Sequence, residues 1–142
     1  MKQRIQSITT VFLALILILS MASCQTKVSK TGLWESATYR ADKEFGKGEK
    51  TVVVEVVAEE QTVTFTIHTD KETVGAALQE HNLIAGDEGQ YGLYVKVVNG
   101  ITADYDIDQS YWAFYINGEM AMTGVDMTLI SEGNVYKLAY TK

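Results

Sequence analysis

Residues 51–81, TVVVEVVAEEQTVTFTIHTDKETVGAALQEH, combine two strand patterns with one helix pattern. Residues 51–58 are almost all β-branched, and Glu59-Glu60-Gln61 separates them from a second run in which Val, Phe and Ile alternate with Thr. β-branched residues favour strands, and strict alternation is typical of a strand with one buried face. The two runs are therefore predicted to pair as a hairpin.

A helix pattern follows this hairpin. Thr69 and Glu72 have the spacing of a capping box, with Asp70 as a rival N-cap, so the helix is predicted to begin here. Its apolar stripe consists of Val74, Ala77, Leu78 and His81. A hairpin crossed by one helix predicts an α+β fold, a β-grasp-like mixed sheet in a single domain.

Further strand patterns occupy residues 91–98, 111–116, 119–122 and 135–141. Asn117-Gly118 lies between two of them, and Asn-Gly flanked by alternating apolar residues is a strong hairpin signal. Alternation sends Tyr111, Ala113 and Tyr115 to one face and Trp112, Phe114 and Ile116 to the other. Either face could be the buried one.

The amino terminus predicts the compartment. Lys2 and Arg4 precede a short apolar run, VFLALILIL, which is typical of a signal peptide rather than a membrane span. Small residues then lead to Cys24, as in the lipobox of bacterial lipoproteins, so residues 1–23 are predicted to be a lipoprotein signal peptide. A diacylated Cys24 would hold the protein on the outer face of the cell membrane. The alternative is a plain secretory signal with an incidental cysteine.

Residues 24–50 are polar and charged, and we expect a tether that packs partly on the domain of residues 51–142. Trp34, Tyr39 and Phe45 favour packing of its second half, because a free linker has no need of large aromatic side chains. The alternative is a disordered stalk.

Composition excludes some partners and chemistries. The net charge is −6, and loss of Lys2 and Arg4 with the signal would make the remainder more acidic, which argues against nucleic acid as a partner. The only cysteine is Cys24, so no disulfide is expected within the domain. None of the common hydrolase, protease or phosphate-binding motifs occurs, and we expect no enzyme and no required cofactor.

A metal site is also a weak expectation. Asp104, Asp106 and Asp108 alternate as the first ligands of a calcium loop do, but Gln109 and Tyr115 stand where that loop needs Gly and Glu. An acidic turn is the favoured interpretation. His68 and His81 lie far apart in the sequence, and no cysteine of the domain accompanies them.

Several short motifs follow one another in a recognisable order. They are Asn99-Gly100-Ile101, Tyr111-Trp112 with Phe114, Asn117-Gly118, Gly124-Val125-Asp126 and a Tyr-rich last strand. This order resembles the C-terminal β domain of the transcobalamin and intrinsic factor family, and a bacterial surface family of unassigned function with the same fold. The resemblance runs from about residue 33 to the end of the chain.

The resemblance implies a ligand. In the transcobalamin family this domain covers one side of cobalamin, and a separate helical-barrel domain supplies the other side and the cobalt-ligating His. By resemblance, the residues that bind cobalamin or a related corrinoid are Val98, Asn99, Gly100, Trp112, Phe114, Tyr115, Met120, Met122, Thr123 and Gly124. The sequence shows no helical barrel, so either the affinity of the isolated domain is expected to be weak or a partner protein completes the site. The alternative is a cell-surface interaction domain that binds protein or glycan.

Overall fold

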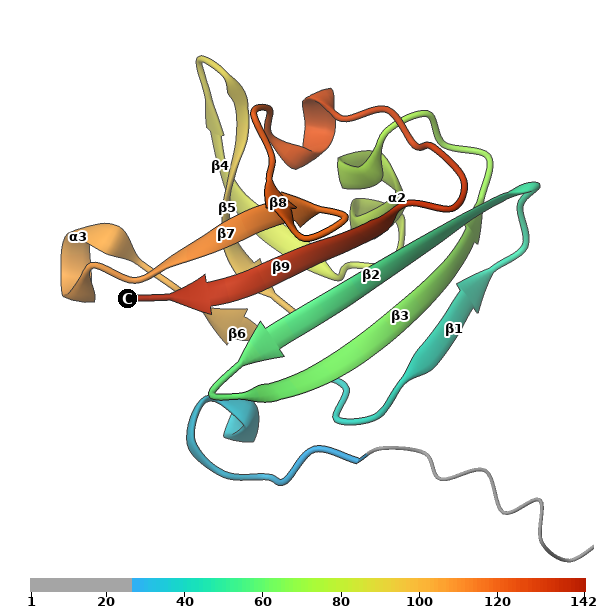
Figure 1. The fold of residues 1–142 in the computed structure, drawn as a ribbon. Coiled ribbons are helices and arrows are strands. Elements are labelled where there is room, and N and C mark those ends of the chain that lie inside the picture. The colour runs from blue at the N-terminus through green and yellow to red at the C-terminus, as the bar shows by residue number, and fades with distance from the viewer. Residues whose placement is uncertain (1–26) are drawn as a thin grey trace, which may run out of the picture.

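The computed structural model describes residues 27–142, so the predicted signal peptide and Cys24 lie outside the described residues. Two sheets form the fold (Figure 1). The larger has the order β1 (Lys43–Gly46), β3 (Gln61–Thr69), β2 (Lys50–Ala58), β9 (Val135–Thr141), β7 (Tyr111–Ile116), β8 (Glu119–Met120). The smaller has the order β4 (Ile84–Gly89), β5 (Gly92–Val98), β6 (Ile101–Thr102). The helical elements are η1 (Gly32–Glu35), α2 (Val74–Glu80), α3 (Tyr105–Asp108) and η2 (Val125–Met127).

The predicted hairpin is confirmed. β2 and β3 pair antiparallel in a continuous register that sets Val54 opposite Phe65. Alternate residues of both strands are fully buried, while the threonines between them lie on the outer face and are half-buried or exposed. β2 is central because its other edge pairs in parallel with β9. The predicted α+β class and single domain are confirmed.

The predicted helix forms, but its N-cap is wrong. Thr73 is the N-cap, and its hydroxyl accepts a hydrogen bond from the backbone N–H of Ala76 at 3.2 Å. Thr69 instead ends β3, with its hydroxyl donating to Glu80, so the strand continues through the position that the capping-box pattern had assigned to the helix. The apolar stripe is as predicted, with its first three residues buried and His81 half-buried as C-cap.

One core joins the two sheets and α2. The buried side chains of β2 and β3 belong to the same cluster as those of α2, β4 and β5, so α2 and the smaller sheet cover one face of the larger sheet (Figure 1). β7 turns Trp112 toward this core, with Phe114 and Ile116 packed against it, while Tyr111 is exposed. The face of β7 that carries Trp112 is therefore the core face, and on the opposite face Ala113 is also buried. Among residues 27–142 there is no helix with the length and hydropathy needed to span a bilayer.

The N-terminal segment is part of the folded body from Val28 onward. Val28 is buried and its N–H donates to the Arg40 carbonyl at 2.7 Å. Trp34 is fully buried, and its indole N–H donates to the Ala58 carbonyl at 2.8 Å, at the end of β2. Packing therefore begins further toward the amino terminus than the aromatic residues alone predict.

A candidate ligand-binding cavity

The tip of the β4–β5 hairpin and the loop before η2 enclose a cavity of about 420 Å³. Three large apolar side chains at its walls are mostly exposed: Met122 is 98%, Tyr91 84% and Met127 66% exposed. Exposed apolar groups that gather in one place are typical of a binding surface. The full lining consists of Gln90, Tyr91, Gly92, Met122, Thr123, Gly124 and Met127.

Asp126 fixes the two walls relative to each other. Its Oδ2 accepts a hydrogen bond from the backbone N–H of Leu93 at 2.8 Å, which ties the hairpin to η2. Gly92 has φ +95, and a Cβ there would lie 2.5 Å from the same oxygen, so only glycine allows this approach. Gly75 of α2 also packs closely against Asp126, because a Cβ there would lie 2.8 Å from the Asp126 backbone. Helix, loop and hairpin therefore meet at one residue, Asp126.

A smaller cavity of about 140 Å³ adjoins the first through Gly124. Trp112 and Phe114 contribute to it from the larger sheet, and Leu93 to Val95 from β5. The indole nitrogen of Trp112 is buried and has no hydrogen-bond partner within residues 27–142, although the ring meets Tyr140 edge-on with centroids 5.7 Å apart. An unsatisfied buried donor costs free energy.

The structure brings together half of the residues named by resemblance. Met122, Thr123 and Gly124 line the larger cavity, and Trp112 and Phe114, with Gly124 again, line the smaller one. Tyr115 and Met120 belong to the β7–β8 hairpin and line neither cavity. Met120 is 60% exposed, and the ring of Tyr115 lies 4.7 Å from Lys137 Nζ.

The remaining three residues, Val98, Asn99 and Gly100, lie where the loop after β5 meets the N-terminal segment. Asn99 is buried with φ +51, and its side chain forms two hydrogen bonds with Tyr39: Oδ1 accepts from N–H at 2.9 Å and Nδ2 donates to the carbonyl at 2.7 Å. The Asn99 backbone N–H donates to Leu83, and its carbonyl accepts from Thr38. Polar groups of this loop that the resemblance assigns to a corrin are thus bonded to the protein itself.

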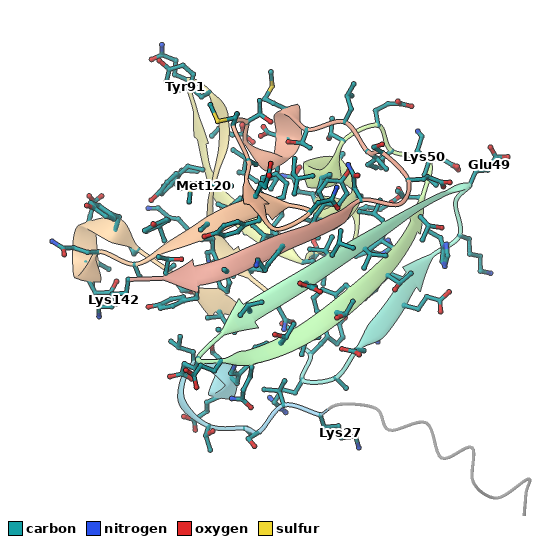
Figure 2. The ribbon with its side chains drawn as sticks, in the orientation of Figure 1. Lys27, Glu49, Lys50, Tyr91, Met120 and Lys142 are labelled. Atoms are coloured by element: carbon teal, nitrogen blue, oxygen red, sulfur yellow. The ribbon has the colours of Figure 1, made fainter. Side chains whose placement is uncertain are left out.

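Gln90, Tyr91 and Met127 were not among the residues named from the sequence. The pattern of residues 91–98 predicts a strand that begins at Tyr91, but Gln90 and Tyr91 form the turn between β4 and β5. Figure 2 shows Tyr91 on the side of the molecule opposite Lys27. A polar run, GDEGQYG, with glycines at both ends is the signal that could have located this turn.

The acidic turn at residues 104–108 has a structural role. Asp104 caps α3 by accepting from the Asp106 N–H, and Asp108 accepts from both the backbone N–H and the hydroxyl of Ser110. The Ser110 hydroxyl and N–H lower the pKa of Asp108 below its usual value. Hydrogen bonding to Asp87, with the charge of Asp104, raises the pKa of Lys96.

No three His, Cys, Asp or Glu side chains in residues 27–142 come together in a way that could hold a metal ion. His68 Nε2 instead lies 2.6 Å from Glu44 Oε1, and the His81 ring packs against that of Phe45 in a tilted arrangement with a centroid distance of 5.2 Å. Both histidines lie at the β1 side of the larger sheet, on other elements than the cavity.

Comparisons with known structures support the fold. A crystal structure at 1.30 Å of a protein from Ruminococcus gnavus ATCC 29149, described as a candidate metal-binding protein, is 33% identical with a TM-score of 0.63. The likeness covers 66% of this chain and 98% of that one. Haptocorrin, in complex with Cbi (cobinamide), is 16% identical with a TM-score of 0.54, over 69% of this chain and 27% of haptocorrin. The second likeness shows the fold alone.

No curated protein matches the chain. A family match covers residues 71–142, from just before α2 through the cavity to the last strand. This is half of the sequence, and it includes every residue that lines either cavity. The chain therefore belongs to the family described as a domain of unknown function, DUF4430.

Proposed function

We propose that the protein is a lipid-anchored, extracytoplasmic ligand-binding module whose cavity receives one face of a corrinoid, cobalamin or a relative of it. The observation that carries the proposal is the ring of exposed Met122, Tyr91 and Met127 around the cavity of about 420 Å³. The likeness of the fold to haptocorrin, which is described with Cbi bound, supports the choice of ligand.

The walls have the chemistry that a flat ligand with an amide rim requires. Thioether and aromatic side chains adapt to an extended apolar surface. Gln90 and Thr123 add polar groups at the same walls, where they can bond to amides of the ligand. Trp112, whose buried indole N–H has no partner among residues 27–142, also lines the adjoining cavity.

The site is open on one side, so affinity should be low. A one-sided contact buries too little of a corrin ring to offset the lost freedom of the ligand, and we expect a dissociation constant of about micromolar or weaker. A partner protein that covers the other side would raise the affinity. Binding requires no catalytic step and no cofactor.

Calorimetric titration with cyanocobalamin tests the proposal on residues 27–142. The double variant Met120→Glu, Met122→Glu should bind at least about tenfold more weakly, because it sets one carboxylate in the apolar wall of the cavity and a second charge on the hairpin that precedes it. Its stability should change little, since both side chains are exposed. Leu129→Glu is the matched control: Leu129 is 69% exposed and lies outside the cavity, so binding should persist.

The anchor is tested separately. Replacement of Cys24 by Ser should abolish incorporation of a clickable fatty acid in the producing cell and release the protein from the membrane. Equal labelling of the variant and the unmodified protein would contradict the lipoprotein assignment.

A second candidate function rests on another surface. Ile107 is 82% and Tyr105 54% exposed on α3, and the ring of Tyr105 lies 6.5 Å from that of Tyr111. Such an apolar patch is typical of a surface that binds protein or glycan. If calorimetric titration of a folded sample with corrinoids shows no binding, and Tyr105→Ala abolishes binding of the protein to a glycan array, this function replaces the first.

A further inference from the structure

We infer that the anchored protein rests on the membrane through its N-terminal end, residues 27–36 and the β2–β3 turn, and that the candidate cavity opens away from the bilayer. The inference rests on the proposed lipid anchor at Cys24 but not on the identity of the ligand. It defines a lipid-facing surface and the side from which a ligand or partner must approach.

The first step is how early the folded body begins. Val28 is buried and bonded to Arg40, and the Ser29 N–H donates to Gln61 Oε1 at 3.1 Å, beside the β2–β3 turn. The Leu33 N–H donates to Glu59 Oε2 at 2.8 Å, and Trp34 is fully buried. These contacts fix residues 28–34 to the end of the β2–β3 hairpin.

The second step is the distance that the link between Cys24 and the folded body can span. Only three peptide units join Cys24 to Lys27, and they can span at most about 11 Å in any conformation. The polar headgroup layer of a bilayer leaflet is itself about 6 Å thick. A lipid-linked Cys24 therefore keeps Lys27 and the β2–β3 turn at or just above the headgroups. If residues 24–50 were a flexible stalk, the domain would not be held this close to the headgroups.

The third step is the position of the cavity relative to the N-terminal segment. β2 runs from Lys50 to Ala58, so its two ends are about 26 Å apart. The N-terminal segment sits at the Ala58 end, whereas Lys50 Nζ donates to the Lys71 carbonyl at the other. Figure 2 shows Lys27 and Tyr91 at opposite sides of the molecule, which places the cavity remote from the anchor.

The consequence concerns access. A cavity that points outward can take a ligand from the medium, or meet a partner that stands on the surface. It is turned away from a protein embedded in the same membrane. A partner that completes the site should therefore be a soluble or surface-exposed domain.

Lysine footprinting tests this orientation. The protein from Cys24 onward has one thiol, so it can be coupled through Cys24 alone to a maleimide phospholipid in phosphatidylcholine vesicles. Reaction of its amines with an acylating reagent is then compared, by mass spectrometry, with protein whose thiol is capped in solution. Lys27 and Lys30, both exposed, should react at least about threefold more slowly on vesicles, and exposed Lys71 should be unchanged.

A matched variant isolates the short linker. Insertion of about 20 Gly and Ser residues after Thr26 gives a root-mean-square span of about 25 Å and should restore the solution rates of Lys27 and Lys30. Unchanged rates of these two lysines on vesicles, or equal slowing of Lys71, would overturn the orientation. Cyanocobalamin titrated into both samples separates the claims. No binding in either sample defeats the corrinoid proposal alone, and binding lost only on vesicles defeats the outward cavity.

Discussion

Replacement of Asn99 by Ala removes a clamp that lies between the N-terminal segment and the loop after β5. The two hydrogen bonds to Tyr39 are lost, and a partly buried backbone N–H and carbonyl are left without partners. Each unsatisfied group costs about 1 to 3 kcal/mol, so the two lost contacts amount to roughly 2 to 6 kcal/mol. The positive φ of +51 adds about 1 kcal/mol for alanine.

Asn117→Ala is the matched control. Asn117 has φ +50, and its side chain also makes two hydrogen bonds, to Val135 and Asn134, but it is exposed. The backbone cost is common to both variants, and the freed groups at Asn117 return to water, so the control should lose only about 1 to 2 kcal/mol. Urea unfolding of residues 27–142 measures the difference. Equal losses for the two variants would refute the clamp, and normal stability with abolished corrinoid binding in the Asn99 variant would return this loop to the ligand site.

Two further predictions concern charge and metal. The pKa of Asp108 is lowered in the folded state by Ser110, so its contribution to stability is present above the unfolded value near 3.8 and is lost as pH falls through the folded value. Asp108→Asn should therefore lower the melting temperature at pH 7 and reduce its decline below pH 4, as measured by thermal unfolding across that range. Because residues 27–142 bring together no group of three metal-binding side chains, added chelator should leave the melting temperature unchanged. A fall of several degrees would reopen the acidic turn at Asp104 as a metal site.

The sequence predicts most of the larger sheet because its strands have clear patterns. β2 and β3 alternate strictly, and their bounds differ from the prediction by a residue or so. β9 begins and ends where the Tyr-rich pattern does. These strands each bury one face, and burial is what produces the alternation.

The missed strands lack that pattern for physical reasons. β4 (IAGDEG) is exposed at all but its first residue and has a bulge after Ala85, so pairing with β5 rather than burial holds it in place. β1 (KEFG) is a short, charged strand at the edge of the sheet. Short length and charge are typical of edge strands because they discourage pairing with a strand of another molecule. The helix N-cap was misplaced because Thr69 and Thr73 both have capping chemistry, and only the length of β3 decides between them.

The candidate site was predictable in part. The Asn117-Gly118 hairpin and the loop at residues 122–124 are local features of the sequence, and three of those loop residues line the cavity. The opposite wall depends on the Asp126 contact with Leu93, which joins residues 33 positions apart. The role of Asn99 also depends on a distant partner, because Tyr39 lies 60 positions away in the chain.

The most direct test of the ligand-binding claim is to map where cyanocobalamin contacts the domain. Titration of the ligand into isotopically labelled residues 27–142, followed by amide NMR, should shift the signals of residues 90–92 and 122–127 first, together with the Trp112 indole N–H. The signals of residues 98–100, which are bonded to the N-terminal segment, should stay in place. Shifts confined to residues 98–100, or no shift at millimolar ligand, would contradict the assignment of the cavity as the binding site.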